Sequence, residues 1–328
     1  MLRIGLLGAG RIGRIHGRNV AAHPGAELAG IADALPAAAE ALAAETGAPV
    51  QAMDALLEDR GIDAVVIAAP TDLHADLIEA AARAGKAVFC EKPVDLDAGR
   101  IRGCLDVVAA AGRPLMVGFN RRFDPSFAAL KARLGAGEIG AVEMITILSR
   151  DPAPPPVSYI ERSGGLFRDM MIHDFDMARF LLDEEPVQVF AAASCLVDPA
   201  IGAAGDVDTA AVTLKTAGGR IVQISNSRRA TYGYDQRIEV HGAAGLLRAG
   251  NRRATTVEAA TAEGYRCDPA LDFFLERYRE AYQAELDAFV DGVTNGRPLT
   301  PSGEDGFHAQ VLADAASESW RTDRPVRL

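Results

Sequence analysis

The segment LRIGLLGAGRIG, residues 2–13, decides the fold of this chain. Its opening apolar run predicts a buried strand, and GAGRIG (8–13) then fits the pattern G-x-G-x-x-G at the start of a helix. In that context the pattern is typical of dinucleotide binding. Gly8 permits a tight turn, Gly10 lets the backbone approach a pyrophosphate, and Gly13 allows close packing of the helix on the strand. The phosphates are then expected at the helix N-terminus, where backbone N–H groups are available to donate.

An acidic residue follows at the distance that this interpretation requires. Asp33 ends the apolar run ELAGIAD (27–33), 20 residues after Gly13, and a carboxylate at this place holds the ribose hydroxyls of a dinucleotide. The same carboxylate would repel a 2′-phosphate, and the next residues, Ala34 and Leu35, supply no arginine to bind one. The sequence therefore predicts NAD rather than NADP as the cofactor. A higher kcat/KM with NADP than with NAD would contradict this prediction.

The first third of the chain alternates short apolar runs with longer alanine-rich segments. The apolar runs are LRIGLLG (2–8), ELAGIAD (27–33), DAVVIAAP (63–70), KAVFCEKP (86–93) and PLMVGF (114–119). The helical segments between them include 35–47, 72–85 and 95–111. Alternation of strands and helices at this spacing predicts a parallel, doubly wound sheet of the Rossmann type.

The pattern changes after Gly118, where longer alternating runs predict a second domain with an open, mostly antiparallel sheet. These runs are EIGAVEMITILSR (138–150), PVQVFAAASCL (186–196), DTAAVTLKTAGGRIVQISNSRR (208–229) and QRIEVHGAAGLLR (236–248). Gly218-Gly219 is a hairpin signal, PAPPP (152–156) predicts a surface loop, and residues 270–320 have a helical pattern. We therefore expect an α/β protein with a Rossmann domain over 1–120 and an α+β substrate-binding and oligomerisation domain over 121–328. Its C-terminal helices are free to pack back on the first domain.

Size and charge restrict the class of function. A chain of 328 residues is long enough for two domains. Its net charge of −11 argues against a nucleic-acid or anionic-membrane partner, because both favour basic surfaces. The four cysteines are scattered, with no C-x-x-C pair. A first strand that begins at Leu2, and the lack of an apolar run of about 18 residues, predict no signal peptide or membrane span, and so a cytoplasmic location.

Two further segments carry side chains suited to chemistry. Lys92 closes the run KAVFCEKP at the carboxyl end of a parallel strand, where ligands bind in such folds. In GGLFRDMMIHDFD (164–176), Asp169 and His173 are four residues apart, which on a helix places their Cβ atoms about 5–6 Å from each other. The pair is open to three interpretations: a surface ion pair on the helix, a metal site with Asp176, or an acid–base pair in a cleft. Zinc sites usually draw on several His or Cys residues, and no second histidine joins this helix.

The motifs together resemble those of the Gfo/Idh/MocA oxidoreductase family. The matching blocks are GAGRIG (8–13), APTDLHADL (69–77), CEKP (90–93), GFNRRFDP (118–125), GGLFRDMMIHDFD (164–176) and ELDAFVDGVTNGRP (285–298). The blocks GFNRRFDP and GGLFRDMMIHDFD, together with RDPAPPP (150–156) and YGYDQR (232–237), are most similar to the branch that oxidises inositols. The resemblance implies NAD-dependent oxidation of a secondary alcohol of a cyclic polyol, myo-inositol to 2-keto-myo-inositol above all. Another inositol isomer or a pyranose sugar is the alternative substrate.

The same resemblance implies roles for individual residues. The lack of a second histidine beside His173, by contrast, is what predicts no metal site. The catalytic positions are Lys92, Asp169 and His173. The cofactor positions are Gly8, Ala9, Gly10, Arg11, Ile12, Gly13, Asp33, Ala69, Pro70, Thr71, His74, Glu91 and Lys92. The substrate positions are Lys92, Arg121, Asp151, Asp169, His173, Asp176 and Tyr234. A non-catalytic regulator that senses dinucleotide is a second class of function, but such a protein is expected to lose the lysine or the histidine. The family also implies a dimer or tetramer that forms through the open sheet.

The chemistry can be argued from the residue types alone. Oxidation of a secondary alcohol needs a base for the hydroxyl proton while hydride leaves the same carbon. The imidazole of His173 is suited to take that proton at neutral pH. Asp169 can orient the imidazole, and Lys92 can donate to the oxygen as it becomes an alkoxide.

Overall fold

The computed structural model describes all 328 residues and divides into two compact units. Unit 1 comprises Met1–Asn120 and Ala281–Gln310, and unit 2 comprises Arg121–Glu280 and Val311–Leu328. The chain passes between the units within the helices α11 (Arg279–Asn295) and α12 (Gly303–Thr322).

Unit 1 is built on a five-stranded sheet with the order β2-β1-β3-β4-β5, and every pair of neighbours is parallel. Its strands are β1 (Leu2–Leu7), β2 (Ala26–Ala32), β3 (Ala64–Ile67), β4 (Ala87–Glu91) and β5 (Leu115–Gly118). Its helices are α1 (Arg11–Ala22), α2 (Pro36–Thr46), α3 (Met53–Glu58), α4 (His74–Arg83) and α5 (Ala98–Ala111), with a 3₁₀ turn, η1 (Thr71–Leu73). Each apolar run expected to be a strand contains one, and the predicted doubly wound sheet is confirmed.

The sheet of unit 1 is buried on both faces, which is why its strands are continuous apolar runs. All four residues of β3 are buried, as are Ile4 and Leu6 of β1. The strand order reverses between β1 and β3, and ligands in such sheets bind outside the carboxyl ends of the strands at that point. The C-terminal part of unit 1 is tied to the last strand, because Val117 N donates to Pro301 O at 2.9 Å.

Unit 2 is built on a seven-stranded sheet with the order β11-β10-β6-β9-β8-β7-β14. Its strands are β6 (Val142–Arg150), β7 (Pro186–Ser194), β8 (Thr209–Thr216), β9 (Ile221–Ser227), β10 (Asp235–Gly242), β11 (Gly245–Ala249) and β14 (Val326–Arg327). Only β6 and β9 pair in parallel, so the prediction of a mostly antiparallel sheet is confirmed. The expected hairpin at Gly218-Gly219 joins β8 to β9.

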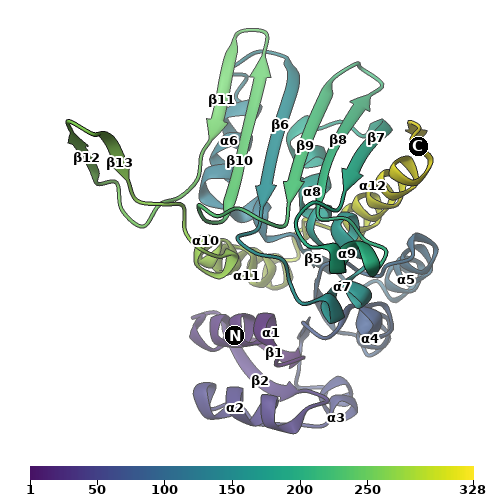
Figure 1. The fold of residues 1–328 in the computed structure, drawn as a ribbon. Helices are drawn as coiled ribbons and strands as arrows, with labels where there is room; N and C mark the ends of the chain where they lie inside the picture. The colour runs from purple at the N-terminus through teal and green to yellow at the C-terminus, as the bar shows by residue number, and fades with distance from the viewer. The chain divides into compact units, whose positions relative to one another are not determined.

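Short helices and turns connect these strands. They are η2 (Asn120–Phe123), α6 (Pro125–Gly135), α7 (Val157–Ser163), the π-helical turn η3 (Leu166–Met170), α8 (Ile172–Leu182), α9 (Pro199–Ala203) and α10 (Phe274–Arg277). In Figure 1, α6 and α8 lie behind the sheet, on the face where Ile145, Leu214 and Val222 are buried. The opposite face exposes alternate residues such as Met144 and Phe190.

Two features of unit 2 differ from the sequence prediction. The run 236–248 was expected as one long strand, but it is two strands, β10 and β11, that turn at Ala243-Ala244. Gly242 allows this turn, because a Cβ there would lie 2.5 Å from Ile139 O. A third hairpin, β12 (Glu258–Thr261) with β13 (Gly264–Cys267), stands away from the large sheet (Figure 1), and all residues of its two strands are exposed. None of the helices combines the length and apolar character needed to cross a lipid bilayer.

Candidate functional site

The glycine-rich segment forms the turn between β1 and α1 in unit 1. Gly8 has φ +100°, and a Cβ on it would lie 2.5 Å from Ala68 O. A Cβ on Gly13 would lie 1.9 Å from Gly8 O, so the fold itself requires glycine at both positions. Gly10 differs, because a Cβ there would meet nothing within 4 Å. The turn is therefore packed tightly on its protein side and open at Gly10, where the expected pyrophosphate approaches.

The carboxylate of Asp33 organises this turn from the end of β2. Ala9 N donates to Asp33 Oδ2 at 2.6 Å, and Leu35 N donates to Asp33 Oδ1 at 2.7 Å. A carboxylate has about four acceptor positions, so these two bonds leave capacity for ribose hydroxyls. Arg11 is exposed and begins α1, while Ile12 is half-buried.

The ends of β3 and β4 supply the next group of predicted cofactor residues. After β3 come the half-buried Ala69 and Thr71 and the exposed Pro70. His74 is buried, with Nε2 at 2.8 Å from Ala69 O and Nδ1 at 2.7 Å from Pro93 O. Its ring therefore joins the segment after β3 to the segment after β4.

Glu91 is the last residue of β4, and Lys92 follows it through a cis peptide bond to Pro93. Lys92 is half-buried. Glu91 is held by His16 of α1, whose Nε2 lies 2.7 Å from Glu91 Oε1.

These residues fit a bound dinucleotide. All of them lie at the carboxyl edge of the unit 1 sheet or at the start of the helix that follows. The N-terminus of α1 has no side-chain cap at Gly10, so its first backbone N–H groups are available to phosphate oxygens. The residues that would hold the cofactor are therefore brought together within one unit.

In unit 2, Asp169 and His173 lie on consecutive turns, but not on one regular α-helix. Asp169 belongs to the π-helical turn η3, in which Met171 N donates to Leu166 O at 2.9 Å, and His173 is the second residue of α8. The spacing of the apolar residues predicts a regular helix here, and that prediction is wrong. The two preceding glycines have φ +85° and +79°, so the chain enters in a conformation that the periodicity of side chains does not reveal.

Both side chains keep exposed surface, and Asp169 has polar neighbours. Tyr159 OH donates to Asp169 Oδ1 at 2.9 Å, and Arg228 NH2 lies 3.9 Å from Asp169 Oδ2. Arg228 is buried and also lies 3.8 Å from Asp206. Asp206 in turn accepts from Leu166 N at 3.1 Å, at the start of the π turn. The buried guanidinium of Arg228 and the turn η3, which Asp206 holds in place, therefore support the position of Asp169 in the predicted acid–base pair.

Of the predicted substrate residues, Arg121, Asp176 and Tyr234 are buried. Arg121 donates to Ser149 Oγ at 2.9 Å and also binds Asp174 Oδ1. Asp176 accepts from Arg122 Nε at 2.8 Å and from the same guanidinium at its other oxygen. These contacts place both residues in structural networks of unit 2. They also count against a metal site with Asp176, because both of its oxygens are engaged by Arg122.

Asp151 is half-buried, unlike the three buried substrate residues, and its carboxyl group has a raised pKa. It follows β6, and its backbone N donates to Ser227 O at 3.0 Å. Burial of the carboxyl group raises the pKa of Asp151 to about 6, an effect that Arg228 opposes and Asp169 increases. The charges that act on the Asp151 carboxyl group therefore include those of Asp169 and Arg228.

Three residues of this region were not predicted from the sequence: Arg228, Tyr159 and Asp174. Arg228 lies in SNSRR (225–229) just beyond β9, and a basic pair after a strand was the available signal. Asp174 binds Arg121 and also accepts from Asn226 Nδ2 at 2.9 Å. Nothing in the local pattern marked it apart from the neighbouring aspartates.

Two family models match the chain, and together they span nearly all of it. Residues 2–119 match the Gfo/Idh/MocA model described as an oxidoreductase family NAD-binding Rossmann fold. Residues 131–328 match the model for the C-terminal alpha/beta domain of the same family.

Individual proteins are similar over their full length. The chain is 57% identical to the inositol 2-dehydrogenase of Rhizobium meliloti strain 1021, with 100% of this chain and 99% of the relative covered. It is 46% identical to the myo-inositol 2-dehydrogenase of Thermotoga maritima, with 100% and 98% covered. A solved scyllo-inositol dehydrogenase of Lactobacillus casei with bound NAD(H) and scyllo-inositol superposes with a TM-score of 0.93. That protein is 31% identical, with 100% of this chain and 99% of that chain covered.

Proposed function

Because this chain belongs to the Gfo/Idh/MocA oxidoreductase family, we propose that it oxidises myo-inositol to 2-keto-myo-inositol with NAD as the hydride acceptor. It is an NAD-dependent dehydrogenase. The observation that carries the substrate assignment is the full-length identity of 57% to an inositol 2-dehydrogenase. Unit 1 supports the assignment of the cofactor through the glycine turn, the open space at Gly10 and the carboxylate of Asp33.

We propose distinct roles for the residues of unit 1. The N–H groups at the start of α1 bind the pyrophosphate, and Asp33 accepts from the adenosine ribose. The residues around Thr71 and His74 line the nicotinamide side, with Glu91. NAD, when bound, supplies the nicotinamide carbon that accepts the hydride. Lys92 donates a hydrogen bond to the substrate oxygen and favours its developing negative charge.

Unit 2 provides the base in this proposal. His173 takes the hydroxyl proton, since an imidazole is suited to accept a proton near neutral pH. Asp169 stabilises the imidazolium that results, and Tyr159 and Arg228 hold Asp169 in place. Asp151 accepts from a substrate hydroxyl, and the buried Arg121, Asp176 and Tyr234 shape the surrounding wall.

A panel of polyols and sugars with NAD tests the substrate, with the absorbance of NADH as the signal. We expect the highest kcat/KM with myo-inositol. scyllo-Inositol is the second candidate, because the similar L. casei protein was solved with that ligand. Activity that is confined to pyranose sugars would contradict the assignment.

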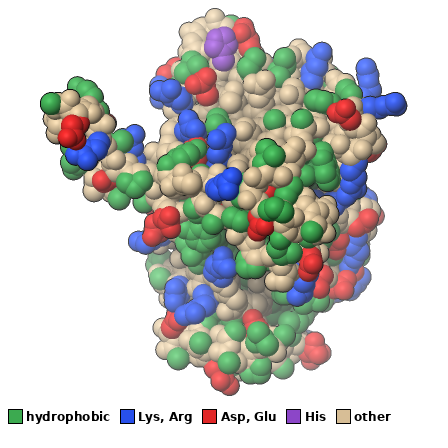
Figure 2. Space-filling model, in the orientation of Figure 1, with side chains coloured by type: hydrophobic (Ala, Val, Ile, Leu, Met, Phe, Trp, Pro, Cys, Tyr) green, Lys and Arg blue, Asp and Glu red, His purple; other side chains and the backbone are tan.

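We also propose that the enzyme is a homo-oligomer of two or four chains that works in the cytoplasm, where the reaction can draw on the cellular NAD pool. The face of the unit 2 sheet opposite α6 and α8 supports the first part, since it exposes Met144 and Phe190 at 39% each. Figure 2 shows hydrophobic side chains scattered among other types on the molecular surface in this view. The same face also carries charged side chains such as Lys215 and Arg248, and a broad sheet face that mixes apolar and charged residues is suited to pairing with a second copy.

A further inference from the structure

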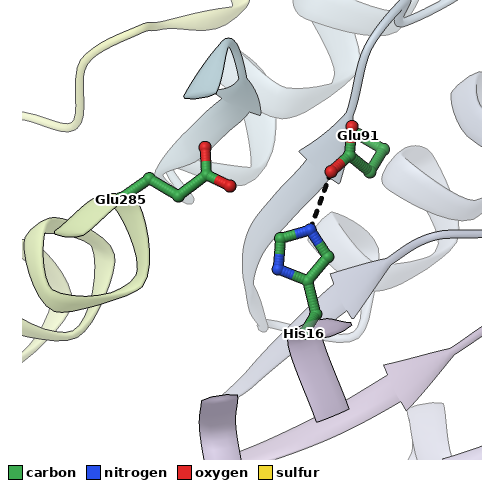
Figure 3. Close-up of side chains that lie close together, drawn as sticks. All are labelled: His16, Glu91 and Glu285. Carbon is green, nitrogen blue, oxygen red and sulfur yellow. Dashed lines mark hydrogen bonds and ion pairs between the residues drawn. The ribbon is translucent and has the colours of Figure 1, made fainter. Parts of the chain in front are cut away.

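A cluster of three titratable side chains lies in unit 1, of which His16 and Glu285 are buried and Glu91 is half-buried. His16 extends from α1, Glu91 from the end of β4 and Glu285 from α11 (Figure 3). One ring nitrogen of His16 and one carboxyl oxygen of each glutamate lie within 4.8 Å of one another. His16 Nε2 lies 2.7 Å from Glu91 Oε1, and it donates there because a carboxylate oxygen can only accept.

Glu285 is the unexplained member of this cluster. It is fully buried, and neither carboxyl oxygen has a hydrogen-bond partner. Figure 3 shows its carboxyl group directed toward His16 and Glu91. An ionised carboxylate in such a place would be strongly unfavourable without a cation or a donor. Burial raises the pKa of Glu285 well above its ordinary value, and the nearby Glu91 raises it further.

The spacing favours a proton over a metal ion. Zinc binds nitrogen and oxygen at about 2.0–2.2 Å, which places neighbouring ligand atoms about 3.3 Å apart in a tetrahedral site. The 2.7 Å separation of His16 and Glu91 is shorter and is that of a hydrogen bond. One carboxyl oxygen of Glu285 lies within 4.8 Å of one of Glu91, but neither oxygen of Glu285 makes a direct hydrogen bond. Such a separation suits two carboxyl groups joined through one ordered water molecule, because two bonds of about 2.8 Å at a water bridge distances up to about this size.

We propose that Glu285 is protonated. Its O–H group donates a hydrogen bond to one water molecule, and that water molecule donates a hydrogen bond to the Glu91 carboxylate. Glu91 then accepts from two sides, from His16 and from this water molecule. When two carboxyl groups lie this close and one of them is buried, the charge on one disfavours ionisation of the other, so one of the two keeps a proton. The proton belongs to Glu285, since Glu91 already has a donor and Glu285 has none.

This arrangement makes His16 and Glu285 positioning residues for the end of β4. The side chain of Glu91 is confined on its other side by Gly118 of β5, where a Cβ would lie 3.1 Å from Glu91 Cδ. Lys92 follows Glu91 directly, so fixing the Glu91 carboxylate fixes the strand end that presents the lysine. This consequence rests on the proposed role of Lys92, whereas the protonation of Glu285 does not.

Infrared difference spectroscopy of the whole protein tests the proton without any turnover. Glu285→Gln subtracted from wild type at neutral pH is expected to show the C=O stretch of a protonated carboxyl group. Glu280→Gln is the matched control, because Glu280 lies on the same helix but is exposed and paired with Arg252. Loss of a carboxylate band in Glu285→Gln would overturn the proposal. So would a stoichiometric divalent cation in wild type that is missing from Glu285→Gln.

Kinetics test the positioning role and its link to Lys92. The Gln side chain can still donate to Glu91, so Glu285→Gln is expected to keep kcat and the KM for NAD within about twofold. Glu285→Ala removes the donor and is expected to lower kcat/KM about tenfold, the equivalent of one hydrogen bond. Equal activity in wild type and both variants would overturn the positioning role, as would an equal loss in both. If Glu285→Ala fails to fold, the infrared spectra of Glu285→Gln still test whether Glu285 is protonated. Because the infrared signal is independent of activity, failure of the proposed function is distinguishable from failure of this inference.

Discussion

His173 is the residue on which the proposed chemistry depends most. It lies at the second position of α8 and keeps exposed surface, while most of its neighbours on that helix are buried. We predict that His173→Ala lowers kcat by about 10²–10⁴-fold, the usual contribution of a general base. NAD binding, measured by quenching of protein fluorescence, is expected to be unchanged because the cofactor residues lie in unit 1. Full turnover in His173→Ala would rule out its role as the base.

The acidity of Asp151 predicts a pH dependence of substrate binding. Its pKa is raised from 3.8 to about 6, so it is protonated below about pH 6 and ionised above. We expect the KM for myo-inositol to rise as the pH falls through about 6, because a protonated carboxyl group is a poorer acceptor for hydroxyls. Asp151→Asn is expected to flatten this part of the profile. An unchanged profile in that variant would assign the pH dependence to another group.

The same shift has a consequence for stability, and its sign is opposite to that of a salt-bridged aspartate. A folded pKa above the ordinary value means that folding penalises the ionised form. Stability is therefore expected to fall as the pH rises between about 4 and 6, and Asp151→Asn is expected to lose that dependence in thermal unfolding.

For single residues, the sequence indicated which residues belong to the cofactor site, but it did not indicate which side chains pair with each other. The glycines, Asp33 and the CEKP lysine were recognisable because backbone geometry and ligand position restrict the residue type locally. Arg121 and Asp176 were placed among the substrate residues, but their partners, Asp174 and Arg122, lie 53 and 54 residues away. No local pattern reports a pairing over that distance.

Among the elements, the turn from β1 to α1 offers a matched pair of substitutions. Gly13→Ala would bring a Cβ within 1.9 Å of Gly8 O, whereas Gly10→Ala meets nothing within 4 Å. We predict that Gly13→Ala loses about 1–3 kcal/mol of stability through overpacking. Gly10→Ala is expected to melt like wild type but to raise the KM for NAD, because its methyl group occupies the space of the pyrophosphate. Equal NAD affinity in Gly10→Ala and wild type would contradict the placement of the cofactor.

The π turn shows where periodicity fails as a guide to structure. The apolar residues around Asp169 and His173 have a helical period of 3.6, and the spacing of four between the two polar residues indicated one helix. The structure instead inserts a wider turn after two glycines of positive φ and anchors it through Asp206. Positive φ at glycine and a hydrogen bond to a residue 40 positions away are invisible in a helical pattern. Such turns are frequent at functional sites.

At the scale of the whole molecule, the two kinds of sheet were predictable and the details of unit 2 were not. Parallel strands buried on both faces are continuous apolar runs, so all five strands of unit 1 could be located. The exposed hairpin of β12 and β13 has no buried face, and therefore no hydrophobic pattern from which to predict it.

The open sheet face predicts the assembly state. We expect light scattering to give at least twice the mass of one chain, and Phe190→Asp to reduce that mass by placing a charge in the interface. Leu196→Asp is the control, since Leu196 is 69% exposed and follows the end of β7. Identical masses for Phe190→Asp and wild type would place the interface elsewhere, and a monomeric wild type would refute the assembly.

The central claim, direct hydride transfer from a cyclic polyol to NAD, is tested most directly with myo-inositol that carries deuterium on carbon 2. After turnover by the purified enzyme, we predict that mass spectrometry finds the deuterium in NADH and that the organic product is the ketone. Formation of NADH without deuterium, or no NADH at all, would contradict the account.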